Sequence, residues 1–217
     1  MKKEKRRNFC IAICMLFAFF LWTVAIKFVD VKAIGPQETS VGFATINKLV
    51  HNFTGVHMHL YTITDWLSLV PFAFVMGFAL LGLVQWIKRK HILKVDYNIL
   101  ILGGFYIVVM AVYALFEILV VNYRPVLIDG DLEASYPSST TMLVMCVMPT
   151  AIMQFNERIK TKILKRLVTS AIIAFVVFMV IGRLVSGVHW FTDIIGGALL
   201  SLGLVLMYRA VVRLKVE

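Results

Sequence analysis

Long apolar stretches limit the folds that this chain can adopt. Six stretches of mainly apolar residues, the fourth shorter than the others, are separated by polar segments over 217 residues. Backbone inside a bilayer must satisfy its own hydrogen bonds, so such stretches are expected to be membrane-spanning helices. The chain is 60% hydrophobic, against about 45–50% for a soluble domain. We therefore predict an all-α polytopic membrane protein, a six-transmembrane-helix bundle, with spans at residues 9–26, 67–86, 98–121, 140–155, 167–185 and 194–212.

The whole chain, residues 1–217, is expected to form a single membrane domain. Residues 1–66 would supply the first span and an outer interfacial segment. Within that segment, residues 35–40 have the composition of a turn, and residues 41–53 have the apolar spacing of an amphipathic helix at a membrane surface. The basic start resembles a signal peptide, but the apolar run is too long for one, so we expect an uncleaved first helix.

The positions of the basic residues predict how the chain sits in the membrane. The net charge of +10 is also compatible with nucleic-acid binding, but the basic residues cluster between the apolar runs, as the positive-inside rule expects. We therefore expect a plasma-membrane protein with both termini in the cytoplasm and no nucleic-acid partner. Of the 22 Lys and Arg residues, all lie in the tails and in loops 88–94 and 158–166 except Lys27, Lys32, Lys48, Arg124 and Arg183.

Polar residues interrupt the apolar pattern between the fifth and sixth predicted spans. His189 and Asp193 are four residues apart, so on a helix they would share a face. The carboxylate could then hold one imidazole nitrogen and leave the other free to attack. Arg183 lies six residues before His189, and its planar group of donors matches the oxygens of a phosphate. The alternative is a boundary arginine with a structural His–Asp pair, which the cost of polar groups at membrane depth disfavours.

The predicted topology brings a second polar loop to the same side of the membrane. Arg124 follows the third span, and residues 122–140 then lie at the outer boundary together with residues 183–193. Arg124, Arg183 and His189 are therefore expected to converge on one site at the outer face.

The spacing near the C-terminus resembles a family signature. Arg183, His189 and Asp193 resemble the third signature of the type 2 phosphatidic acid phosphatases (PAP2), the membrane branch of the vanadium-chloroperoxidase-like superfamily. Arg124-Pro125 is similar to the end of the first signature. Residues 137–140, Pro-Ser-Ser-Thr, stand where the second signature, Pro-Ser-Gly-His, belongs. The resemblance covers about residues 67–212, the expected PAP2-like core.

The resemblance implies an enzyme and its site. The family dephosphorylates lipid phosphates and diphosphates through a phosphohistidine, without a metal or another cofactor. His189 would be the nucleophile and Asp193 the carboxylate that orients it. The substrate partner would be a lipid phosphate or diphosphate, such as a polyprenyl diphosphate or a phosphatidate. The phosphate-binding residues implied are Arg124, Arg183, Ser138, Ser139 and Thr140.

Four positions depart from the family pattern. Thr140 replaces the general-acid histidine, Ser139 replaces the glycine before it, Gly182 replaces a serine, and Glu117 replaces the lysine of the first signature. General acid catalysis matters least for a phosphate leaving group, so we expect a preference for diphosphates. Glu117 is expected to pair with Arg124. The alternatives are that it is a buried, protonated acid that supplies the missing proton, or that it only packs against another helix.

Two other readings of the polar residues remain open. One is a catalytically impaired relative that binds anionic lipids, and the other is a transporter or scaffold whose polar groups line a path. His57 and His59 lack a clear third metal ligand, so an interfacial role is expected for them. The cysteines form no metal or disulfide pattern and are expected in apolar packing; they are Cys10, Cys14 and Cys146.

Overall fold

The structure, a computed structural model, describes residues 2–214, with side chains from Arg6 onward. The basic side chains predicted for the tails at Lys2, Lys3, Lys5 and Lys215 lie outside the described part. Within that part the named secondary-structure elements are helices except for a two-stranded antiparallel ribbon, β1 (Lys32–Ala33) and β2 (Ser40–Val41). The helices are α1 (Lys2–Phe28), η1 (Pro36–Glu38), α2 (Ala44–Thr54), α3 (Met58–Leu67), α4 (Leu69–Arg89), η2 (Ile92–Lys94), α5 (Tyr97–Ile118), α6 (Ser139–Arg158), α7 (Lys162–Val185) and α8 (Phe191–Val212).

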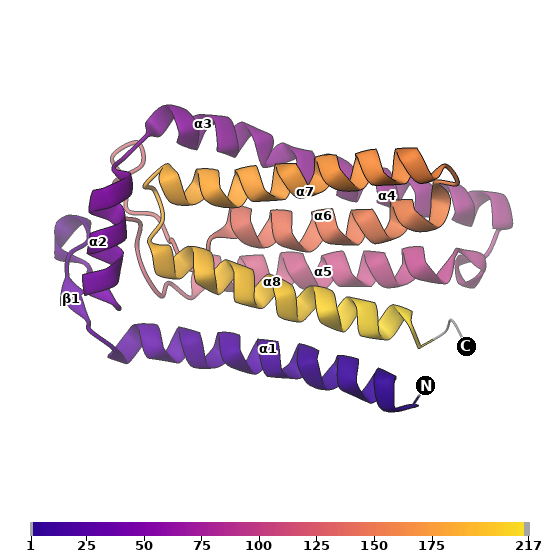
Figure 1. The fold of residues 1–217 in the computed structure, drawn as a ribbon, viewed down its shortest axis with the longest axis horizontal. Helices are drawn as coiled ribbons and strands as arrows, with labels where there is room; N and C mark the ends of the chain where they lie inside the picture. The colour runs from indigo at the N-terminus through magenta and orange to yellow at the C-terminus, as the bar shows by residue number, and fades with distance from the viewer. Residues whose placement is uncertain (1, 215–217) are drawn as a thin grey trace.

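The long helices run side by side along the long axis of the molecule (Figure 1). The predicted all-α architecture is confirmed, but the count of six spans is not. Helices α3 and α4 follow each other with only Ser68 between them, so the predicted second span begins at Met58 rather than at residue 67. Five segments of the described chain are long and apolar enough to cross a membrane, namely Arg6–Phe28, Met58–Arg89, Tyr97–Ile118, Lys162–Val185 and Phe191–Val212.

Helix α6 stands where the fourth span was predicted, yet it is not among these five segments. It lies within the bundle, packed against α4, α5, α7 and α8 (Figure 1). Its polar residues meet polar partners there: the hydroxyls of Thr150 and Tyr106 are 3.1 Å apart, and Nε2 of Gln154 donates to the hydroxyl of Tyr208 at 2.8 Å. Because α6 faces protein rather than lipid, its sequence is free to be less apolar than that of its neighbours.

Residues 30–57 form a cap over one end of the bundle. The predicted turn at residues 35–40 is η1 and the residues around it, between β1 and β2. Helix α2, which the apolar spacing of residues 41–53 predicted, lies across the ends of the long helices (Figure 1). Asn47 ties this cap to the start of α8, because its side chain accepts from the amide of Thr192 at 3.1 Å and donates to the hydroxyl of Thr192 at 3.0 Å.

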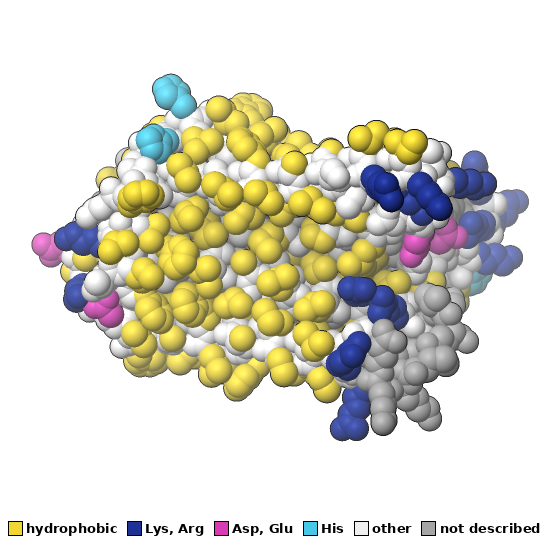
Figure 2. Space-filling view, in the orientation of Figure 1, with side chains coloured by type: hydrophobic (Ala, Val, Ile, Leu, Met, Phe, Trp, Pro, Cys, Tyr) yellow, Lys and Arg dark blue, Asp and Glu magenta, His cyan; other side chains and the backbone are white. Residues whose placement is uncertain are grey.

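The two ends of the bundle differ in charge. We call the end that carries residues 30–57 and the loops 119–138 and 186–190 the cap end, and the other the termini end. Apolar side chains form a broad band across the middle of the molecule in Figure 2, and Lys and Arg side chains gather at the termini end. This is the distribution expected of a bundle that spans a bilayer with one end in the cytoplasm.

Candidate functional site

The residues that resemble the third signature span the end of α7, a short loop and the first turn of α8. Gly187 in this loop has a φ of 71°, a conformation that favours glycine, and a Cβ there would lie 2.0 Å from the carbonyl oxygen of Gly55. The loop therefore fits tightly against the turn between α2 and α3. The amide of His57 donates to the carbonyl of Ser186 at 2.9 Å, so the two loops are also hydrogen-bonded.

The first turn of α8 fixes Asp193. Its Oδ2 accepts from the amide of Trp190 at 2.9 Å, which satisfies a backbone donor at the helix start. The indole nitrogen of Trp190 in turn donates to the carbonyl of Tyr123 at 2.8 Å. This contact joins the start of α8 to the loop between α5 and α6.

The expected direct contact between His189 and Asp193 is not formed. Nδ1 of His189 lies 4.0 Å from Oδ2 of Asp193 because His189 precedes α8 instead of lying on it. The hydroxyl of Ser135 lies between them, 3.0 Å from Nδ1 and 2.5 Å from Oδ2. A serine from another loop thus links the histidine and the aspartate that the spacing predicted to be in direct contact.

The loop between α5 and α6 places Arg124 beside this pair. Its two ends run antiparallel: the amide of Arg124 donates to the carbonyl of Glu133 at 3.0 Å, and the amide of Ser135 donates to the carbonyl of Asn122 at 2.9 Å. The side chain of Arg124 is buried, and its Nε lies 3.0 Å from Oε2 of Glu133, although not in hydrogen-bond geometry. One short loop therefore carries both a guanidinium and the serine that contacts His189.

Arg183 reaches the site from the last turn of α7 and is 1% exposed. Its Nη1 lies 3.6 Å from Oδ1 of Asp65 and 3.4 Å from the hydroxyl of Thr64, both on α3. The ring of Tyr61, one turn earlier on α3, lies 4.9 Å from the guanidinium of Arg183 and 5.7 Å from that of Arg124. Both arginines thus meet at one aromatic face, an arrangement that attracts cations.

Buried nitrogens at this point have no hydrogen-bond partner among the described residues. They include Nη1 of Arg124, Nε of Arg183 and Nε2 of His189. Buried polar atoms in folded proteins almost always have partners, so these nitrogens are available to a bound group. Two guanidinium groups provide donors for an anion, and Nε2 provides a nitrogen that can attack it.

A cavity of about 720 Å³ opens beside the two arginines. Arg124 and Arg183 line it together with Asp65 and Glu133, whereas His189 is not on its wall and is 3% exposed. Burial and the positive charges of the two arginines lower the pKa of His189 well below its usual 6.5. The imidazole is therefore neutral at pH 7 and retains the lone pair that a nucleophile needs.

The residues that resemble the second signature begin α6. Ser139 and Thr140, which the resemblance implies as phosphate-binding residues, line the cavity. Ser138 is buried and caps the helix: its hydroxyl accepts from the amide of Thr141 at 3.4 Å, and its own amide donates to the carbonyl of Asp193 at 3.1 Å. Ser138 therefore holds α6 against α8 and does not line the cavity.

Glu117 lies in the last turn of α5 and lines the cavity. The predicted ion pair with Arg124 is wrong, because the carboxylate that Arg124 contacts in the described structure is that of Glu133. Glu117 is also exposed, which disagrees with the alternative of a buried, protonated acid. Its carboxylate adds negative charge to the wall of the cavity.

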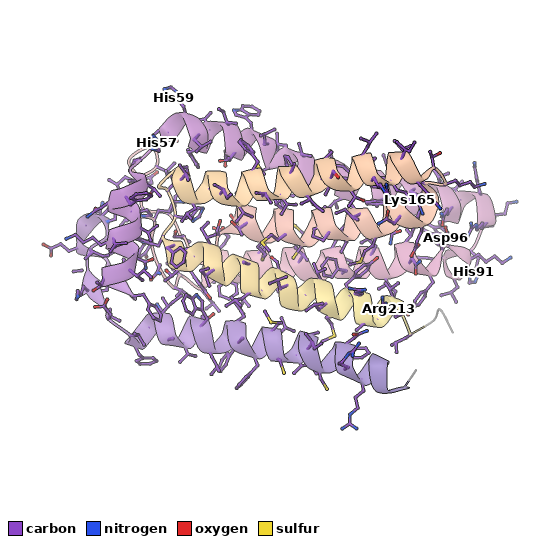
Figure 3. All side chains as sticks on the ribbon, viewed as in Figure 1. His57, His59, His91, Asp96, Lys165 and Arg213 are labelled. Atoms are coloured by element: carbon purple, nitrogen blue, oxygen red, sulfur yellow. The ribbon has the colours of Figure 1, made fainter. Side chains whose placement is uncertain are left out.

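His57 and His59 lie on the surface at the start of α3, near the cap (Figure 3). Both side chains are exposed, and Nε2 of His57 is 2.8 Å from the carbonyl of Thr54. Within residues 2–214, no three His, Cys, Asp or Glu residues lie close enough together to hold a metal ion.

Several site residues were not singled out from the sequence. Asp65 and Glu133 follow no motif, and only the fold shows that each lies beside an arginine. Ser135 stands two residues before the Pro-Ser-Ser-Thr segment, so its position next to a family-like motif was the one available signal. Tyr61 belongs to no motif either, and only the fold shows that its ring lies beside both arginines.

Comparisons with known proteins agree on the family and the fold. The family model of the PAP2 superfamily matches residues 9–216. A solved structure, the first transmembrane PAP2 type phosphatidylglycerolphosphate phosphatase from Bacillus subtilis, aligns with a TM-score of 0.68 and 16% identity, over 94% of this chain and 96% of that chain. No curated protein matches the chain. At such identity the structural likeness concerns the fold.

Proposed function

The chain belongs to the PAP2 superfamily, and from that premise we propose that it hydrolyses a lipid phosphate or diphosphate through a phosphohistidine at His189. The observation that carries this proposal is the set of buried, unpartnered nitrogens of Arg124, Arg183 and His189. Two arginines with free donors suit the oxygens of a phosphoryl group. The neutral imidazole beside them suits attack on its phosphorus.

In the proposed reaction the phosphoryl group binds between the arginines and the start of α6, where Ser139 and Thr140 line the cavity and the N-terminus of a helix favours an anion. Nε2 of His189 bonds to phosphorus while the bond from phosphorus to the leaving oxygen breaks, and that oxygen takes the electron pair. Water then attacks phosphorus and releases the imidazole. Charge stabilisation and in-line positioning supply most of the catalysis.

An apolar groove supports a lipid as the substrate. It has a volume of about 600 Å³ and lies between α4 and α5, with Phe78, Leu102 and Ile107 among its lining residues. Met110 lines both this groove and the polar cavity. A head group in the cavity would therefore have its chain next to an apolar surface, which removes that chain from water.

The charge distribution supports an outer-face site in the plasma membrane. The site lies at the cap end, and the Lys and Arg side chains gather at the termini end (Figure 2). Basic ends face the cytoplasm. Six crossings, with α6 counted as one, would return both termini to that side.

The experiment that tests this function is phosphate release by the purified protein in detergent, with chelator present. Polyprenyl diphosphate, polyprenyl phosphate and phosphatidate are compared, and His189→Ala is the control. Release that persists in chelator and disappears in His189→Ala, with phosphate trapped on His189 of the parent protein, is expected. Release that His189→Ala leaves intact would contradict the proposal.

The proposal also includes a preference for a phosphate as the leaving group. Thr140 lines the cavity where the family has its general acid, so diphosphates are expected to react faster than monophosphates. Introducing the acid by Thr140→His should raise monophosphate turnover more than diphosphate turnover, with Thr140→Asn as the size control. Equal or faster turnover of the monophosphate by the parent protein would contradict this preference.

A second candidate is an impaired relative that binds anionic lipids. Thr140 in place of histidine and the carboxylate of Glu117 on the cavity wall favour it. Lipid binding that depends on Arg124 and Arg183, without release of phosphate from any lipid, would select this candidate.

A further inference from the structure

We propose that Ser135 is a positioning residue that connects His189 to Asp193 and determines which imidazole nitrogen attacks. The inference rests on the proposed phosphohistidine reaction. Its basis is geometric: the serine hydroxyl is 3.0 Å from Nδ1 and 2.5 Å from Oδ2, whereas the imidazole and the carboxylate are 4.0 Å apart. No direct His–Asp hydrogen bond exists at that distance.

The donors and acceptors in this chain of contacts allow one arrangement for a nucleophilic histidine. An ionised Asp193 can only accept, so the serine hydroxyl gives its proton to Oδ2. The serine oxygen then accepts from Nδ1, which must carry the imidazole proton. Nε2 is left with its lone pair, and Nε2 is the buried nitrogen without a partner among the described residues.

Asp193 is held too firmly to replace the serine. Its Oδ2 also accepts from the amide of Trp190 at 2.9 Å, and its Oδ1 accepts from the side-chain amide of Asn122 at 3.4 Å. These contacts come from two different loops and hold the carboxylate where its Oδ2 is 4.0 Å from Nδ1 of His189. Without the hydroxyl of Ser135, Nδ1 of His189 would lose the side-chain partner that links it to Asp193.

Ser135 is itself fixed by the loop that carries Arg124. It is 2% exposed, and its amide donates to the carbonyl of Asn122 at 2.9 Å. Arg124 lies on the same pair of antiparallel segments, with its amide bonded to Glu133. The loop therefore sets the phosphate-binding arginine and the orientation of the nucleophile together.

The hydrogen bond between His189 and Ser135 becomes stronger as the reaction proceeds. When Nε2 bonds to phosphorus, the imidazole becomes positively charged and keeps its proton on Nδ1. The serine oxygen accepts a stronger, charge-assisted hydrogen bond from that proton, and the carboxylate stabilises the charge through the serine. Such an interaction is stronger in the transition state than in the resting enzyme, so its removal should lower kcat rather than raise KM.

The test compares Ser135→Ala and Ser135→Cys with Ser201→Ala in the full-length protein. Ser201 is a matched control because it is fully buried, but its hydroxyl donates to backbone carbonyls of Gly197 and Met142. Both Ser135 variants should lose kcat by about 10²-fold, the effect of a small misplacement of a reacting group, with KM little changed. Ser201→Ala should keep the parent kcat. Ser135→Cys conserves volume and so guards against misfolding of the alanine variant.

Two further measurements separate positioning from packing. Ser135→Thr keeps the hydroxyl and should retain more kcat than Ser135→Cys. Combined with Asp193→Asn, Ser135→Ala should add little further loss, because both act through one chain of contacts. A kcat of Ser135→Ala within about twofold of the Ser201→Ala value, or a fully additive double variant, would overturn the inference. An inactive parent protein would instead contradict the proposed function.

Discussion

At the level of single residues, each arginine that we propose to bind phosphate already faces a carboxylate. Arg124 lies beside Glu133 and Arg183 beside Asp65, and the two acids are 42% and 55% exposed in their side chains whereas the arginines are buried. A phosphoryl group has to compete with these carboxylates for the guanidinium donors. Partly exposed ion pairs are weak, about 0–1 kcal/mol each, so a bound phosphate can displace these carboxylates from the guanidinium groups.

Removing one of these carboxylates is therefore expected to tighten substrate binding. Glu133→Gln and Asp65→Asn should each lower KM by about two- to fivefold, because the phosphate no longer displaces a negative charge. The measurement is steady-state phosphate release over a range of lipid concentrations. Asp96→Asn is the control, because its ion pair with Arg89 lies at the termini end (Figure 3). A KM that rises in both site variants would show that the acids help to hold the arginines in place.

The buried imidazole gives the reaction a distinctive pH dependence. The pKa of His189 is lowered well below 6.5 by burial and by Arg124 and Arg183. The imidazole, our proposed nucleophile, therefore stays neutral as the pH falls through 6.5, and kcat/KM should begin to fall only at lower pH. The free energy of unfolding should also decrease below pH 6.5, because the unfolded chain then binds a proton that the folded chain does not.

A histidine titration followed by NMR, with His189→Ala to assign the signal, measures this pKa directly. Arg124→Gln removes one of the two positive charges and should move the pKa back towards 6.5. A pKa at or above 6.5 in the parent protein would contradict the electrostatic argument.

The residues that could be predicted were those with a fixed sequence spacing. Arg183, His189 and Asp193 lie close together along the chain, so their pattern was visible without a structure. Asp65 and Ser135 lie far from them in sequence and reach the site only through the packing of α3 and of the loop after α5. No local pattern encodes such contacts, and this is also why Glu117 was paired with the wrong partner.

At the level of helices, the packing of α3 against α7 explains one departure from the family pattern. Gly182 stands where the family has a serine, and a Cβ there would lie 2.8 Å from Cγ2 of Thr64. The hydroxyl of Thr64 accepts from Arg183, so the close approach of the two helices also orients that arginine. The glycine thus allows α3 to bring its side chains to the site.

Gly182→Ala is expected to destabilise the protein by about 1–3 kcal/mol through overpacking. Thr64→Ser removes the methyl group and keeps the hydroxyl, so it should restore most of that loss in the double variant. Thermal unfolding in detergent measures both effects, with phosphate release recorded alongside. Equal unfolding temperatures for Gly182→Ala and the parent protein would show that α3 is free to shift.

Helix positions were predicted well where a helix faces lipid and less well where it does not. Helices α1, α5, α7 and α8 agree with predicted spans, because lipid contact demands long apolar runs. Helix α6 is surrounded by protein, and its polar residues, such as Gln154, shorten the apolar run that the sequence shows. The start of α3 was missed because His57 and His59 interrupt the apolar pattern there.

At the level of the whole molecule, the site and most basic side chains lie at opposite ends of the bundle (Figure 2). The orientation of the bundle therefore decides which lipids can reach the site. With the termini end in the cytoplasm, the site meets lipids of the outer leaflet, and with the cap end in the cytoplasm it would meet lipids of the cytoplasmic leaflet. The positive-inside rule favours the outer leaflet because loops 88–94 and 158–166 are basic and short.

Cysteine labelling decides between the two orientations. In a protein whose three native cysteines are replaced, Phe53→Cys probes the cap end and Leu93→Cys the termini end; the parent side chains are 90% and 77% exposed. A membrane-impermeant maleimide should label Phe53→Cys in intact cells and Leu93→Cys only after the cells are opened, because the basic residues of loop 88–94 are expected to keep it in the cytoplasm. Retained phosphate release in both variants is the control for folding. The opposite labelling pattern would place the site in the cytoplasm and make a cytoplasmic-leaflet lipid the substrate.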